Sequence, residues 1–169
     1  MLKKISRSLS RLLEWTVIIL MVVLTLVVII AVFYRKLGAS LSWYDEVASV
    51  MLAWITYYGA ALAALKRRHI GFDTLLLAMP PRLRMAAVVV SEVLVIGFFA
   101  IMAWAGFQIL KVLTGDTLIS LTWVPVRLTQ SVIPIGAVLF IVAELLSLPG
   151  YWRATRDGIS LDHVEPEED

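Results

Sequence analysis

Few residues of this sequence can do chemistry, and two acids stand out because they interrupt long apolar runs. These acids are Glu92 and Glu144. Ionisable side chains within a membrane segment commonly belong to a proton or ion pathway. The alternative is structural: each acid reaches the membrane interface or bonds a neighbouring helix, for example through Arg82, Arg84 or Arg153. We favour the structural alternative, because the centres of the apolar runs carry no further ionisable group.

Other reactive groups are scarce. The sequence has no cysteine and two histidines, His69 and His163, and both histidines lie outside the apolar runs. A thiolate metal site, a cysteine nucleophile and a pair of axial haem ligands within the membrane are therefore not expected. Neither an H-E-x-x-H motif nor a phosphate-binding glycine loop is present. We expect no enzyme, no cofactor or metal held by this chain and, with 15 Lys+Arg against 13 Asp+Glu, no nucleic-acid partner.

The composition indicates an all-α integral membrane protein. Hydrophobic residues make up 60% of the 169 residues and charged residues 17%, whereas a soluble domain has roughly 45–50% and about 25%. A hydrocarbon core of about 30 Å requires ~20 residues of helix. The apolar runs predict four transmembrane helices, at about 15–34, 47–65, 86–110 and 128–148, which together form a membrane domain over 15–152.

The distribution of positive charge predicts the orientation. Most Lys and Arg residues lie before the first span, between the second and third spans, and after the fourth. Because loops rich in Lys and Arg stay in the cytoplasm, both termini are predicted to be cytoplasmic. The protein is accordingly expected to be a multi-pass protein of a bacterial inner membrane, in contact with lipid.

Three segments outside the spans have their own patterns. Residues 1–14 are basic and amphipathic, which fits either a helix on the cytoplasmic leaflet or an extension of the first span. Residues 70–79 are too apolar for a solvated loop and too short to span, so they predict an interfacial helix between spans two and three. Residues 153–169 form an acidic tail that is predicted to be disordered.

The predicted spans contain features for packing against other helices, and not those of a pathway for ions or solutes. Span two contains pairs of small residues four apart, such as Gly59 and Ala63, which allow helix backbones to approach closely. In span four, Pro134 and Gly136 can kink or thin the helix, because proline removes a bond from the helical ladder. These features favour an accessory subunit whose function is to form an interface.

Several motifs together resemble one known family. They are Leu41-Ser42-Trp43-Tyr44-Asp45-Glu46, Trp54 to Gly59, Lys66 to Asp73 with His69, Pro80-Pro81-Arg82, Trp123-Val124-Pro125 and Pro134-Ile135-Gly136. In this order and spacing the chain resembles, over about residues 15–148, the small membrane subunit (DctQ-like) of tripartite ATP-independent periplasmic (TRAP) transporters.

The resemblance implies a role in a three-part transporter. A periplasmic solute-binding protein captures a small organic acid, such as a sugar acid or a dicarboxylate. A large multi-span permease binds the solute and sodium ions and moves them by an elevator-like motion. The small subunit is then a non-catalytic scaffold that braces the permease, with a docking role toward the binding protein as a further expectation. Sodium is expected on the permease and not on this chain.

The resemblance also implies roles for individual residues. Asp45 and Glu46 match an acidic pair that would bond backbone groups at the start of span two, cap that helix, or face a basic patch on a partner. His69 and Asp73 would fix the interfacial helix by a local hydrogen bond. Trp54 and Gly59 would face the large subunit or a neighbouring span, and Pro125 and Pro134 belong to the pattern of the last span.

Two other functions fit the same residues. A self-sufficient small transporter or pore would act as an oligomer through Glu92 and Glu144. A membrane-anchored assembly factor would recruit a soluble protein through its basic N-terminus or its acidic tail.

Overall fold

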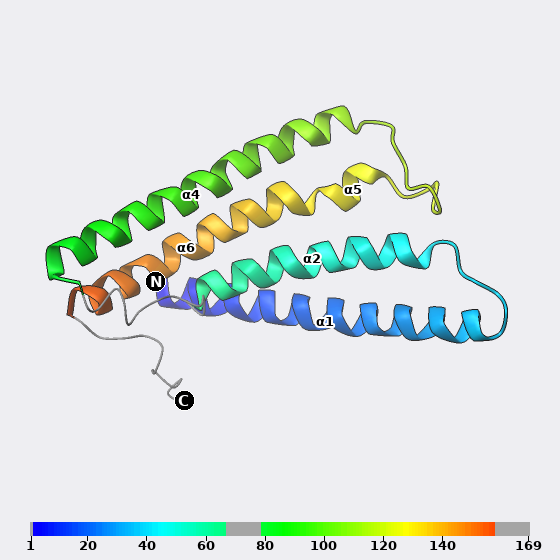
Figure 1. Ribbon diagram of the computed structural model, residues 1–169, viewed down its shortest axis with the longest axis horizontal. Helices are drawn as coiled ribbons and strands as arrows, with labels where there is room; N and C mark the ends of the chain where they lie inside the picture. Colours follow the sequence, from blue (N-terminus) through cyan, green and yellow to red (C-terminus); the bar gives the residue numbers. More distant parts are fainter. Residues whose placement is uncertain (1, 67–78, 158–169) are drawn as a thin grey trace.

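The computed structural model describes residues 2–66 and 79–157 (Figure 1). These residues form the helices α1 (Leu2–Lys36), α2 (Tyr44–Leu65), α4 (Pro81–Val112), α5 (Val126–Gln130) and α6 (Val132–Asp157). Within the described ranges, the only extended pairing is an isolated antiparallel bridge between Thr117 and Pro125. The predicted interfacial helix at 70–79 lies, apart from Met79, outside the described residues, as do His69 and Asp73.

Four helical segments are long and apolar enough to cross a membrane, which confirms the predicted fold class. They are Lys4–Lys36, Tyr44–Leu65, Pro81–Val112 and Val126–Asp157, the last of which combines α5 and α6. The start of α1 and the end of α6 lie at the same end of the molecule (Figure 1), as an even number of spans requires. Which side of the membrane this end faces stays a prediction.

The four segments pack in a row, in the order α4, α6, α2, α1 (Figure 1). Helix α6 lies between α4 and α2, and α1 packs mainly on α2. The burial follows this order, because 39% of the most apolar stretch of the α5–α6 segment is buried, against 6% for α1 and for α4. Few residues of the outer helices are therefore fully buried within this chain, and many of their large apolar side chains are exposed.

Small and aromatic side chains form the core where α1, α2, α6 and α4 converge. The buried cluster consists of Leu13, Ala61, Ala64, Leu65, Phe140 and Ala143. The alanines let α2 approach its neighbours closely, as small residues do between membrane helices. Phe99 of α4 stacks on Phe140 of α6, with ring centroids 3.7 Å apart and planes 11° from parallel.

Two glycines set the distances on either side of α6. A Cβ at Gly136 would lie 2.7 Å from the Cβ of Tyr57 on α2. A Cβ at Gly106 of α4 would lie 2.9 Å from Cδ of Pro134 on α6. Both helix pairs thus approach at positions where no side chain larger than hydrogen fits without a shift.

The kink predicted near Pro134 is present as a break between α5 and α6. Helix α5 ends at Gln130 and α6 begins at Val132, with Ser131 in a turn. Proline has no N–H to donate to the carbonyl four residues earlier, and its ring collides with that carbonyl. For Pro134 this carbonyl belongs to Gln130, so the break falls where the ladder bond is lost.

The structure agrees with one of the two alternatives for the N-terminal segment and moves one predicted segment boundary. Helix α1 runs without interruption from Leu2, so residues 2–14 belong to the same helix as the first span. Helix α6 continues past residue 148 and through Pro149 to Asp157. Residues 153–157, assigned to the disordered tail, are therefore helical. Thr155 is 3% exposed and its carbonyl accepts a bond from Nη1 of Arg84 at 3.2 Å. Residues 158–169 lie outside the described ranges.

Candidate functional site

A short hairpin connects α4 to α5, and we call residues 116–126 the 116–126 hairpin. The N–H of Val126 donates to the carbonyl of Asp116 at 2.9 Å, and the N–H of Leu118 donates to that of Val124 at 3.0 Å. Gly115, with a φ of +99°, supplies the left-handed turn that leads into it. The hairpin lies beside the start of α2 (Figure 1).

Glu46 in the first turn of α2 holds the tip of this hairpin. Its Oε1 accepts the N–H of Ile119 and its Oε2 accepts the N–H of Ser120, both at 2.9 Å. The Ser120 hydroxyl also donates to the carbonyl of Ser42 at 3.0 Å. We call these contacts the Glu46 clamp. A carboxylate that accepts two backbone donors makes strong, charge-assisted hydrogen bonds, so the clamp fixes the hairpin to α2.

The two acids at the start of α2, Asp45 and Glu46, therefore have different roles. Helix α2 follows Trp43, whose side chain makes no capping bond. Glu46 bonds backbone N–H groups of the hairpin, and not those at the start of its own helix as the sequence predicted. Asp45 is exposed to solvent, so of the two acids it is the one available to a partner. The sequence could not indicate the clamp, because the bonded residues lie 73 and 74 positions apart.

Trp54 joins α2 to α5. Its indole Nε1 donates to the carbonyl of Thr129 at 3.0 Å, and its ring meets Tyr58 edge-on with centroids 6.2 Å apart. Trp54 therefore faces a neighbouring segment of its own chain. Gly59 differs, because a Cβ added there would meet nothing within 4 Å. Its side of α2 has room for a group from outside the chain.

The two prolines that the sequence singled out have structural positions. Pro125 pairs with Thr117 across the hairpin and stands immediately before α5. Pro134 is fully buried and packs against Gly106. Gly106 and Tyr57 were not among the residues that the sequence singled out, because a single helix does not show which of its residues a neighbouring helix approaches.

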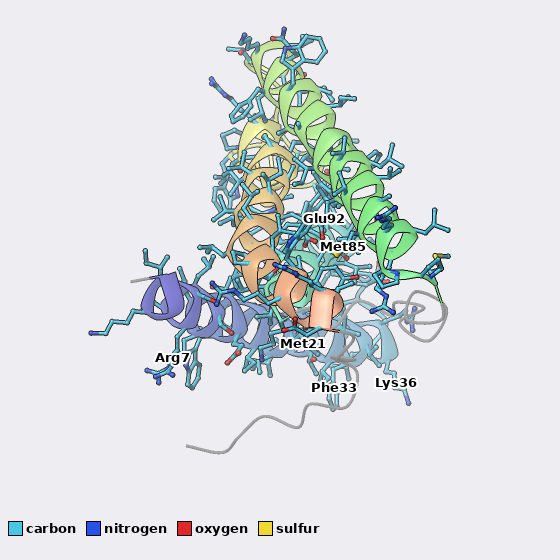
Figure 2. All side chains as sticks on the ribbon, turned by 90° about the vertical axis from the view of Figure 1, so that its left-hand side faces the viewer. Arg7, Met21, Phe33, Lys36, Met85 and Glu92 are labelled. Atoms are coloured by element: carbon cyan, nitrogen blue, oxygen red, sulfur yellow. The ribbon has the colours of Figure 1, made fainter. Side chains whose placement is uncertain are left out.

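The intramembrane acids are buried within the chain. Glu92 on α4 is 9% exposed and Glu144 on α6 is 5% exposed, and these two helices pack on each other. At 1.5 Å per residue, Glu92 lies about 17 Å along α4 from Pro81 and Glu144 about 20 Å along α6 from Asp157. Both helix ends are at the same end of the molecule (Figure 1), so the two acids lie at a similar depth. Figure 2 shows Glu92 on the inner side of α4.

The opposite end of α2 is tied to α1. Nζ of Lys66 lies 2.7 Å from Oε1 of Glu14, and the Ser10 hydroxyl donates to the same oxygen at 2.9 Å. Both charged side chains remain more than one third exposed. The sequence alone did not indicate this ion pair.

These contacts are structural and not reactive. Within residues 2–66 and 79–157, no three His, Asp or Glu side chains gather as a metal site would require. The Glu46 clamp, the Trp54 bond and the Glu14–Lys66 ion pair each join two segments. The molecule so far described is a multi-pass helical membrane protein whose polar groups serve mainly to hold its own helices and loops together.

Comparison with known proteins assigns the family. The family model described as "Tripartite ATP-independent periplasmic transporters, DctQ component" matches residues 24–154. The chain therefore belongs to the DctQ family and is the small membrane subunit of a TRAP transporter. This family works with the DctM permease and the DctP binding protein and is a transporter component, generally non-enzymatic. No curated protein matches the chain.

Proposed function

We propose that this subunit is a scaffold that braces the large permease in the membrane and carries neither solute nor sodium itself. The transporter would be a sodium symporter for small organic acids, in a bacterial inner membrane, with both termini of this subunit in the cytoplasm. The observation that carries the proposal is a contrast in burial. The acids of the membrane segments are buried, whereas the apolar faces of the outer helices are exposed.

The exposed faces are large enough to support a protein partner. Bulky side chains along α1 and α4 have more than half of their surface exposed, including Leu12, Trp15 and Phe33 on α1 and Leu94, Ile101 and Trp104 on α4. Within a bilayer, lipid or a second membrane protein covers such a face, and association between helices depends on close packing. A permease helix packed along α4 or α1 would convert this surface into an interface.

The buried acids argue against transport by this chain alone. A pore formed by several copies would place its ionisable groups on the surface that the copies share. Glu92 and Glu144 instead lie inside each copy, on helices that pack together. We propose that both acids stabilise the α4–α6 pair.

The proposal also includes docking of the periplasmic binding protein. The exposed Asp45 lies beside the Glu46 clamp, at the end that the predicted orientation places in the periplasm. A basic patch on the binding protein would find its carboxylate accessible. Changing Asp45 to Lys would then raise the concentration of binding protein needed for half-maximal uptake, with the maximal rate little changed.

Reconstitution tests the scaffold role. Proteoliposomes that contain the permease and the binding protein would be assayed for sodium-driven uptake, with and without this subunit. We expect uptake only with the subunit, and none from the subunit alone. Full uptake without it would contradict the proposal, and so would uptake by the subunit alone.

Cross-linking tests the interface. A photoreactive reagent would be attached to a single cysteine at Ile101, which is 68% exposed, and in a matched control at Ala103, which is 8% exposed. The proposal expects a cross-link to the permease from position 101 and little from position 103. If an α1 position such as Phe33 forms the cross-link instead, the interface is on α1. Cross-links from neither helix would overturn the bracing role.

A further inference from the structure

The Glu46 clamp fixes the depth of the 116–126 hairpin in the membrane. Ile119 and Ser120 are bonded directly to the first turn of α2. The hairpin tip therefore lies level with Trp43 and Tyr44, at the beginning of a membrane-spanning helix. Figure 1 shows the hairpin beside the start of α2, and it does not extend past the far end of α1. This position corresponds to the boundary between lipid and water.

The composition of the hairpin suits that boundary. Residues 117–126 carry no charge, and the hairpin exposes two large apolar side chains, with Ile119 at 91% and Trp123 at 79% exposed. Leu118 points the other way and is 8% exposed. Tryptophan is enriched at membrane interfaces, where its ring enters the headgroup layer.

The hydrogen bonding of the hairpin backbone also suits a position at the boundary between lipid and water. Non-helical backbone near the hydrocarbon is tolerated only when its polar groups have partners, because lipid supplies none. Leu118 and Val126 donate across the hairpin and Val124 donates to Leu121. Glu46 supplies the acceptors for the two donors at the tip. Glu46 keeps part of its surface exposed, which suits the membrane interface, where water is accessible, better than the hydrocarbon core.

We propose that the 116–126 hairpin is a membrane-interface anchor, with Ile119 and Trp123 immersed among the lipids. The Glu46 clamp permits this depth, because it accepts the two backbone N–H groups at the hairpin tip, which lipid could not do. The occupant of the exposed apolar surface is then lipid, and not a soluble protein or the permease. This inference does not depend on the scaffold role.

Spin labelling measures the depth directly, because the chain has no native cysteine. A nitroxide would be attached at Ile119→Cys or Trp123→Cys in the complete transporter in lipid nanodiscs. Its accessibility to oxygen, which concentrates in lipid, would be compared with that to a water-soluble nickel chelate. The reference positions are Leu145→Cys, at an exposed position within α6, and Asp157→Cys, at the exposed end of α6.

The hairpin labels should show an oxygen-to-nickel ratio between those of the two references, and on the order of threefold above that of Asp157→Cys. A ratio equal to that of Asp157→Cys would place the hairpin in water and overturn the proposal. Protection from both reagents would place a protein over the hairpin and would also overturn it.

A second variant tests the clamp. Glu46→Ala, combined with the label at Ile119→Cys, removes both acceptors, so the tip should move toward water and its nickel accessibility should rise. Asp45→Ala is the matched control, since that neighbouring acid makes no bond to the hairpin tip, and it should leave the ratio unchanged. An unchanged ratio in Glu46→Ala would show that the clamp does not hold the hairpin at this depth.

Discussion

At the scale of single residues, the absence of a side chain matters as much as the presence of one. Gly136 allows α6 to lie directly against Tyr57, and Trp54 gives its one indole proton to the carbonyl of Thr129. Neither contact was visible in the sequence. A glycine in an apolar run can allow a kink, allow a close approach between helices, or have no structural role. Which of these applies depends on the helix that packs against it.

Replacing Gly136 with alanine should destabilise the protein by about 1–3 kcal/mol, the usual effect of overpacking. The added Cβ would lie 2.7 Å from the Cβ of Tyr57, an atom next to the backbone that cannot swing away. Thermal unfolding of the purified chain in detergent measures the effect. Gly97→Ala is the control, because a Cβ there meets nothing within 4 Å. Equal unfolding temperatures for the two variants would contradict the proposed contact.

Replacing Trp54 with phenylalanine keeps a ring but removes the donor to Thr129. The loss should be about 1 kcal/mol, typical of a hydrogen bond to a neutral acceptor. Trp104→Phe provides the comparison, since Trp104 is 65% exposed in the isolated chain. If both variants unfold at the same temperature, the Trp54 bond does not contribute measurably.

At the scale of helices and loops, the sequence predicted which helices exist better than it predicted where each helix begins and ends. The four spans followed from hydropathy, and the break near Gln130 followed from Pro134, because both depend on local properties. The continuation of α6 to Asp157 did not, because it depends on burial of Thr155 against other parts of the chain. The Glu46 clamp could not be predicted either, since hydropathy does not report a contact between a helix and a hairpin that are distant in the sequence.

The attachment of α1 to α2 provides a prediction at this scale. The ion pair between Glu14 and Lys66 is partly exposed, and such pairs contribute about 0–1 kcal/mol. Leu13 is 3% exposed within the core cluster, and truncating a buried leucine costs about 2 kcal/mol or more. Lys66→Ala should therefore lower the thermal stability much less than Leu13→Ala. The reverse order would show that charge, and not packing, holds α1 in place.

At the scale of the whole molecule, the question is whether this subunit conducts anything. Glu92→Gln and Glu144→Gln keep the shape of each side chain and remove its charge. If the acids serve only the α4–α6 pair, sodium-driven uptake by the complete transporter should fall less than about threefold, in proportion to any loss of folded protein. Uptake assays normalised to the amount of assembled complex measure this. Complete loss of uptake with normal assembly would instead favour a conducting role.

The row of helices has a consequence for the shape of any assembly. Because α1 and α4 stand at opposite edges and do not close into a ring (Figures 1 and 2), the subunit offers two unlike borders in the plane of the bilayer. A single neighbour on one border leaves the other against acyl chains. We expect the resulting particle to be asymmetric, with one edge of this subunit turned away from its neighbour.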